Sequence, residues 1–147
     1  MESSHTYDIG YQIQQISHFL KQIQNAQLLT EGLSISHVNV MYVLYTQDCV
    51  TQSFIQKKLG IKASSLSKLI DILMQKGLVT RKVSERDARI KLICLTPSGK
   101  TKKAQLYAIT KDIEQQLTLG LEKTEITTLS ALLSTVKSNL ESFNQTP

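Results

Sequence analysis

Apolar residues recur at steps of three and four positions along two long segments, one near each end of the 147-residue chain. Such spacing places them along one narrow face of a helix, and that face needs a second helix to cover it. We therefore expect a mainly α-helical protein whose terminal helices pair with each other or with a second copy of the chain. The apolar positions are Ile9, Ile13, Ile16, Leu20 and Ile23 in the first segment, and Ile126, Leu129, Leu133, Val136, Leu140 and Phe143 in the second.

Three shorter helices are predicted between these ends. Ser34 and Thr51 have side chains that cap helix N-termini, and Gly60 stands where the second of these helices would end. The third helix is predicted over residues 63–76, with Gly77 just after it. The apolar residues of this third helix fall on one side, which leaves the opposite side free for polar contacts. They are Leu66, Leu69, Ile70, Leu73 and Met74.

A β-hairpin and a further helix follow the third short helix. Residues 78–83 and 89–95 are rich in β-branched side chains and predict two strands, joined by the charged segment 84–88. Thr96 and Pro97 suit the first positions of a helix. The order helix, short helix, helix and hairpin predicts a winged helix-turn-helix with a two-stranded β wing, flanked by N- and C-terminal dimerisation helices.

Positive charge is concentrated in the middle of the chain. Residues 57–103 contain 13 of the 17 Lys and Arg residues and only three acidic residues, which gives this segment a net charge of +10. The flanking segments carry −3 and −2. A basic module between mildly acidic flanks is typical of a protein that binds a polyanion, although a solvated cationic face remains an alternative. The three arginines, Arg81, Arg86 and Arg89, fall within nine residues, and arginine suits phosphates and narrow grooves.

Composition argues against several classes of protein. With 41% hydrophobic residues the chain can bury a core, and no apolar run is long enough to span a membrane. The first residues do not resemble a secretory signal, so we expect a cytoplasmic protein. Cys49 and Cys94 are too few for a disulfide framework, and we expect both to be reduced. Trp is absent, which argues against stacking on single-stranded nucleic acid.

The third short helix and the hairpin are the candidate DNA-binding elements. A helix fits the major groove of B-DNA, with its N-terminal residues at base edges. The hairpin tip would lie over the adjacent minor groove, whose negative potential favours an inserted arginine; we assign this role to Arg89. Asp87 would hold that arginine in place without touching DNA, since a carboxylate repels phosphate. The candidate DNA-binding residues are Lys62, Ser64, Ser65, Ser67, Lys68, Arg86, Arg89 and Lys91.

These ordered motifs resemble the MarR family of bacterial transcription regulators. Residues 51–61 are similar to the family's helix-turn-helix entry, and residues 64–81 to its recognition helix and exit. Asp87-Ala88-Arg89 resembles its Asp-x-Arg wing motif, and Leu95-Thr96-Pro97-Ser98-Gly99 its Leu-Thr-x-x-Gly junction. His37 stands where the family often has Gln or Glu to close a capping box with Ser34, which predicts a weaker cap.

The resemblance implies a homodimeric repressor that binds a pseudo-palindromic double-stranded operator. It implies an N-terminal dimerisation helix over 1–32, a winged helix-turn-helix over 33–100 and C-terminal dimerisation helices over 101–147. It also implies a cavity for a small-molecule effector that releases the DNA. Candidate lining residues are Tyr11, His18, His37, Tyr42 and Tyr107, each of which could equally be an ordinary core or surface residue.

Other functions have less support in the sequence. The histidines lack metal-site spacing, so we expect no metal and no cofactor. No catalytic motif is present, so we do not expect an enzyme. Regulation by oxidation of Cys49 is an alternative, disfavoured because the first helix lacks the cysteine of the family's peroxide sensors. A winged helix that binds a protein is a second alternative; its binding would respond weakly to salt, whereas DNA binding would weaken steeply.

Overall fold

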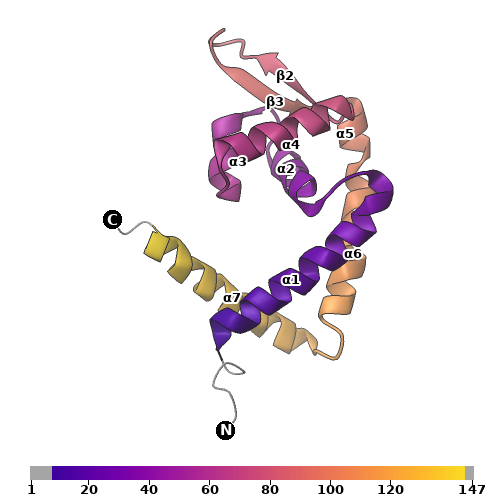
Figure 1. Cartoon of the computed structure of the whole chain (residues 1–147), viewed down its shortest axis with the longest axis vertical. Helices are drawn as coiled ribbons and strands as arrows, with labels where there is room; N and C mark the ends of the chain where they lie inside the picture. The colour runs from indigo at the N-terminus through magenta and orange to yellow at the C-terminus, as the bar shows by residue number, and fades with distance from the viewer. Residues whose placement is uncertain (1–7, 145–147) are drawn as a thin grey trace. The chain divides into compact units, whose positions relative to one another are not determined.

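The computed structural model describes residues 8–144. The chain forms two compact units that divide between Lys111 and Asp112. The first unit contains the winged-helix lobe, which we define as residues 35–95, together with the N-terminal helix and the start of α6 (Lys103–Leu117). The second unit contains the rest of α6 and α7 (Lys123–Asn144) (Figure 1). None of the described helices is long and apolar enough to cross a membrane.

The N-terminal helix α1 (Ile9–Leu28) begins at Asp8, whose carboxylate accepts a hydrogen bond from the backbone N–H of Gly10 at 3.0 Å. A short 3-10 helix, η2 (Leu29–Glu31), continues it. Gly32 then ends the segment in the left-handed conformation, with φ of 65°. Residues 1–7 of the N-terminal dimerisation helix expected over 1–32 lie outside the described residues.

Helix α2 (Ile35–Thr46) begins at Ser34, as predicted, and its cap is complete. The ring nitrogen Nδ1 of His37 accepts a hydrogen bond from the Ser34 backbone N–H at 3.0 Å and lies 2.9 Å from the Ser34 hydroxyl oxygen. An unprotonated imidazole nitrogen thus serves as the acceptor that a Glu or Gln side chain supplies elsewhere, while the weaker strength of this cap stays a prediction.

Helices α3 (Gln52–Leu59) and α4 (Ala63–Gln75) form the helix-turn-helix. The Thr51 hydroxyl accepts from Phe54 N at 3.1 Å and starts α3, while Gly60, at φ of 65°, ends it. Both caps were predicted from the sequence. The core of the lobe lies between α2, α3, α4 and the sheet, and its fully buried side chains are Val38, Val40, Met41, Leu44, Ile55, Leu66, Ile70, Leu73 and Ile93.

The sheet has three antiparallel strands in the order β1-β3-β2. Strands β2 (Val79–Val83) and β3 (Lys91–Leu95) form the predicted hairpin. Strand β1 (Val50–Thr51), which the sequence did not reveal, pairs Val50 with Ile93 and Thr51 with Leu92. The wing is thus a hairpin whose base is widened by a third, two-residue strand directly before α3.

Cys49 and Cys94 are joined by a disulfide across strands β1 and β3. The expectation that both cysteines are reduced was wrong for this structure. The reason is topological: Val50 pairs with Ile93, so Cys49, just before Val50, lies opposite Cys94, just after Ile93, with the two Cα atoms 4.2 Å apart. Cys94 is buried.

The helix predicted after the wing is divided into α5 (Pro97–Thr101) and α6, with only Lys102 between them. Thr96 caps α5 by accepting from Gly99 N at 3.0 Å, and Pro97 occupies the first position, as predicted. A Cβ atom on Gly99 would lie 2.1 Å from the carbonyl oxygen of Leu78, so this junction requires glycine. It holds α5 closely against Leu78, the residue before β2.

Candidate nucleic-acid interface

Helix α4 presents one buried side and one polar side. Leu66, Ile70 and Leu73 are fully buried against the core. This orientation leaves the side chains on the opposite side, half a helical turn away, in solvent. Of the predicted contact residues on and before α4, Lys62, Ser64, Ser65 and Lys68 are exposed, and Ser67 is half-buried. The first two turns of α4 can therefore reach a groove with hydroxyl and ammonium groups.

Ser67 is held by a residue that the sequence analysis did not select. The side-chain amide of Gln52, the first residue of α3, donates a hydrogen bond to the Ser67 hydroxyl oxygen at 2.8 Å. This bond occupies an acceptor site of the hydroxyl and leaves its hydrogen free to be donated elsewhere. No local pattern in the sequence signals this contact, because the two residues lie on different helices.

The wing tip has a defined conformation. Ser84 N donates to Ile90 O at 2.8 Å, and Ile90 N donates to Asp87 O at 3.0 Å. Inside this turn the Asp87 carboxylate accepts three hydrogen bonds from Arg89, from its backbone N, Nε and Nη2, at 3.0, 3.1 and 3.1 Å. The contact by which Asp87 was predicted to hold Arg89 in place is thus formed within the wing itself.

The Asp87–Arg89 pair leaves the arginine accessible. The Arg89 side chain is 91% exposed although its guanidinium is bound on one side. The hydrogen bonds from Arg89 hold the pKa of the Asp87 carboxyl below its usual value. The carboxylate therefore stays ionised and keeps the guanidinium oriented, while the remaining N–H groups of Arg89 point to no protein acceptor that the structure describes.

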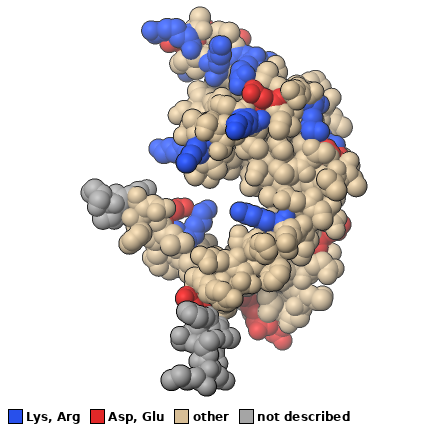
Figure 2. Space-filling model, viewed as in Figure 1, with Lys and Arg blue, Asp and Glu red and all other residues tan. Residues whose placement is uncertain are grey.

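A second ion pair ties the recognition helix to the wing. Arg81 on β2 lies 3.7 Å from Asp71 on α4. Arg81 therefore has an acidic partner within the lobe, although it is exposed like Arg86 and Arg89 near the wing tip. We define the basic surface as Lys62, Lys68, Arg86, Arg89 and Lys91. Lys and Arg side chains gather over the winged-helix lobe and along the wing (Figure 2).

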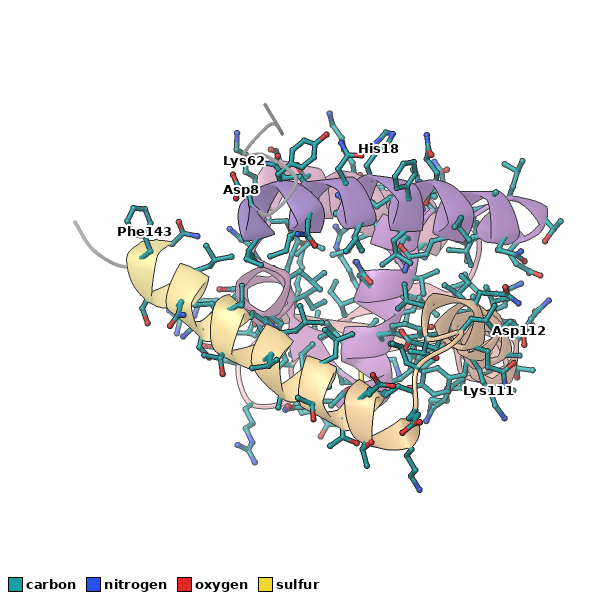
Figure 3. All side chains as sticks on the ribbon, turned by 90° about the horizontal axis from the view of Figure 1, so that it is seen from below. Asp8, His18, Lys62, Lys111, Asp112 and Phe143 are labelled. Atoms are coloured by element: carbon teal, nitrogen blue, oxygen red, sulfur yellow. A yellow bond between two sulfur atoms is a disulfide. The ribbon has the colours of Figure 1, made fainter. Side chains whose placement is uncertain are left out.

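The residues predicted to line an effector cavity are dispersed. Tyr11 and His18 are exposed on α1, and His18 points outward from the helix (Figure 3). His37 is used in the α2 cap. Tyr42 donates to Leu106 O at 3.3 Å and is hydrogen-bonded to Thr110, which joins α2 to α6. The rings of Tyr42 and Tyr107 are 5.3 Å apart and belong to an aromatic cluster with Tyr45.

A surface cavity of about 680 Å³ lies beside the recognition helix and contains none of those aromatic residues. Its walls come from the start of α2, the turn between α3 and α4, and the first turns of α4. Three of the predicted DNA contacts, Lys62, Ser65 and Lys68, line it. The full lining is Ser36, Asn39, Leu59, Gly60, Ile61, Lys62, Ser65, Lys68 and Leu69.

One group of possible metal ligands occurs among residues 8–144. Single ligand atoms of Asp48, Cys49 and Cys94 lie within 4.8 Å of one another. Both sulfur atoms are in the disulfide, so neither is a thiolate ligand in this form. In this structure the group is therefore a disulfide with a neighbouring carboxylate rather than a metal site.

Comparison with known proteins agrees with the geometry. A sequence model of the MarR family matches residues 33–91. The multiple antibiotic resistance protein MarR of Escherichia coli is 26% identical over 129 residues, which cover 87% of this chain and 90% of that protein. Residues 33–91 are a MarR-family domain. The fold prediction of a winged helix-turn-helix is confirmed, and the protein is a MarR-family transcriptional regulator.

Two further relatives extend the comparison of this MarR-family chain. The transcriptional regulator YdgJ of Bacillus subtilis is 35% identical over 69 residues, which span 47% of this chain and 42% of YdgJ. The Staphylococcus aureus MepR–DNA complex has a TM-score of 0.81 at 29% identity and covers 93% of this chain and 99% of that one. A mutant of Escherichia coli MarR complexed with operator DNA has a TM-score of 0.80 at 26% identity, over 89% of this chain and 94% of that one.

Proposed function

We propose that this MarR-family regulator binds a pseudo-palindromic operator in double-stranded DNA as a homodimer and represses transcription in the cytoplasm. The proposal rests on the presence of two exposed, basic elements in one lobe. The first two turns of α4 are polar and basic, and the wing holds Arg89 in a bidentate contact while leaving it accessible. One element suits a major groove and the other an adjacent minor groove.

Helix α4 is assigned to base readout. Ser64, Ser65 and Lys68 are exposed on its first two turns, and Ser67 is oriented by Gln52. A hydroxyl that accepts from Gln52 presents its hydrogen outward, so Ser67 suits a base acceptor such as guanine O6 or adenine N7. Lys62 precedes the helix and suits a phosphate, because the helix N-terminus also attracts anions there.

The wing is assigned to the minor groove and its phosphates. Arg89 enters the groove, while Arg86 and Lys91 contact the backbone on either side. All three side chains are exposed. The orientation of Arg89 is set before DNA binds, which reduces the conformational entropy lost on binding.

The apolar faces of α1 and α7 support a homodimer. Ile9, Ile16 and Ile23 of α1 are between 51% and 60% exposed, and no residue of α7 is buried. Exposed apolar rows of this extent are typical of surfaces that a partner covers. We propose that residues 1–32 and 101–147 of two chains pair, so that two copies of the lobe face two half-sites of the operator. A dimer bound across a promoter would exclude other proteins from it.

The test is selection of duplexes from a random library by the purified full chain, combined with light scattering. The proposal expects enriched sequences with two inverted half-sites and a mass of twice 16.5 kDa. Enrichment of single half-sites by a monomer would overturn the dimer. Failure to enrich any duplex would overturn DNA recognition and favour a winged helix that binds a protein.

A further inference from the structure

The disulfide between Cys49 and Cys94 joins an exposed residue to a buried one. Cys49 lies in the connector between α2 and β1 and is exposed, with φ of 53°, in the left-handed region that side-chain-bearing residues seldom adopt. Cys94 on β3 is 1% exposed. These are the two cysteines of the whole sequence, so no other pairing within one chain competes.

We propose that Cys49 and Cys94 form a reversible thiol–disulfide couple, and that Cys49 is the sulfur at which low-molecular-weight thiols and disulfides exchange with it. The assignment of Cys49 as the exchanging sulfur rests on the difference in exposure between the two cysteines. A thiolate attacks a disulfide along the S–S axis and must reach one sulfur from solvent. Cys49 offers that access, whereas Cys94 lies in the core beside Ile93 and Leu95, which are buried.

The exchange balances with a small thiol as the reductant in one direction and the corresponding small disulfide as the oxidant in the other. In reduction, the thiolate of a small thiol attacks Cys49 Sγ, a new S–S bond forms, and the Cys49–Cys94 bond breaks with Cys94 leaving as a thiolate that takes up a proton. A second small thiol then attacks the mixed disulfide, which yields two free cysteines and one small disulfide. In oxidation, the Cys49 thiolate attacks a small disulfide, whose S–S bond breaks and releases one small thiolate. The Cys94 thiolate then attacks Cys49 Sγ of the mixed disulfide, the Cys49–Cys94 bond forms, and the second small thiolate leaves.

Asp48 governs the rate of this exchange. One carboxylate oxygen of Asp48 accepts from Cys49 N and from Leu95 N, each at 2.8 Å, and so lies against both ends of the disulfide. Its negative charge repels an incoming thiolate. Asp48→Asn keeps an acceptor oxygen for both N–H groups and removes the charge. A unit charge at about 4 Å in water contributes about 1 kcal/mol, so this variant should be reduced about five-fold faster at low salt.

Whether the two cysteines are oxidised or reduced also affects DNA binding, and this part of the inference rests on the proposed function. Strand β1 continues directly into α3, whose first residue, Gln52, holds Ser67 of the recognition helix. Strand β3 continues from the wing tip. The disulfide therefore links the helix-turn-helix to the wing. Without it, β1 and β3 are joined by two residue pairs, and we expect about three-fold weaker DNA binding because the two contact elements are less preorganised.

The experiment treats the full chain with reduced and oxidised glutathione and reads the products by intact mass and peptide mapping. The expected intermediate carries one glutathione on Cys49. Cys94→Ala should accept one glutathione, and Cys49→Ser, whose remaining cysteine is buried, should accept none while folded. A glutathione mapped to Cys94 in the wild type, or two free thiols at every glutathione ratio, would overturn the proposal. Peptide mapping of the wild type decides the site even where Cys94→Ala fails to fold.

DNA anisotropy with and without dithiothreitol tests the coupling. Wild-type affinity should fall about three-fold on reduction, whereas Cys49→Ser should be insensitive to the reductant. Equal wild-type affinity in both states would overturn the coupling while leaving the exchange chemistry intact. A protein that exchanges glutathione at Cys49 but binds no duplex would instead contradict the proposed function.

Discussion

The carboxylate of Asp87 accepts three hydrogen bonds from Arg89, two residues along the same wing turn. The arginine side chain nevertheless remains 91% exposed. A guanidinium is planar and has five N–H donors, so a bidentate carboxylate fixes its orientation while the other donors stay available. The wing therefore presents a preorganised cation rather than a freely rotating one.

This relationship predicts different effects for the two residues. Arg89→Ala should weaken operator binding by about 1–3 kcal/mol, because it removes the groove contact itself. Asp87→Ala should weaken binding by a smaller amount, because Arg89 keeps its charge and loses only its orientation. Anisotropy gives both affinities, and thermal melting by circular dichroism should show little change for either exposed site. If Asp87→Ala binds as tightly as the wild type, the carboxylate has no orienting role.

Gln52 predicts an effect on sequence preference. Gln52→Ala removes the donor that orients Ser67, so the discrimination between operator and mismatched duplexes should fall by about 1 kcal/mol, a fraction of one base contact. Ser53→Ala, an exposed neighbour on α3, is the matched control and should retain the preference. The measurement is competition binding with single-base operator variants. Equal loss of affinity for every duplex would assign Gln52 to phosphate contact instead.

Gly99 predicts a loss of stability without a change in the DNA-binding surface. The Cβ atom of Gly99→Ala would meet the Leu78 carbonyl oxygen at 2.1 Å, which forces the backbone apart at a cost of about 1–3 kcal/mol. The control is Gly10→Ala, whose Cβ would meet its nearest neighbour at 3.4 Å. Chemical denaturation should show a lower free energy of unfolding for Gly99→Ala than for Gly10→Ala. Equal stability would show that α5 can shift away from β2 freely.

The lowered pKa of His37 predicts that the protein loses stability in weak acid. Burial, and then the nearby charge of Lys76, lowers the pKa of His37 below its usual value of 6.5. The unfolded chain therefore binds the proton more readily than the folded one, so the free energy of unfolding falls as the pH drops below 6.5. Protonation also removes the Nδ1 acceptor that closes the α2 cap.

A substitution of His37 isolates this effect. His37→Gln keeps an acceptor suited to the capping box and removes the titrating group. Its unfolding free energy should therefore change less than that of the wild type as the pH is lowered through 6.5. Parallel pH dependences for the two proteins would show that other groups cause the acid sensitivity.

The helices of the lobe could be predicted because their signals are local. Ser34, Thr51 and Gly60 begin or end helices through contacts within three or four residues of each position. The spacing of the apolar residues along α4 likewise indicates directly which side of the helix is buried. The wing strands were found from their β-branched content, and the order of all these elements indicated the fold.

The contacts that escaped prediction join distant parts of the chain. Strand β1 has two residues, too few to show a period, and it exists only because β3 pairs with it. The disulfide follows from that pairing across a sequence separation of 45. The Gln52–Ser67 bond requires the angle between α3 and α4, which no local pattern specifies. The roles of the surface lysines and arginines in DNA binding stay predictions.

The salt dependence of binding to a selected operator tests the central claim most directly. Lys62, Arg86 and Lys91 of the basic surface are assigned to phosphates, and each phosphate neutralised contributes a slope of about −0.9 to the plot of log K against log salt concentration. For a dimer with both copies of these residues bound, we predict a slope of about −5 between about 50 and 200 mM salt, shallower for Arg86→Ala. A flat dependence, or a slope unchanged in Arg86→Ala, would contradict recognition of DNA by this surface.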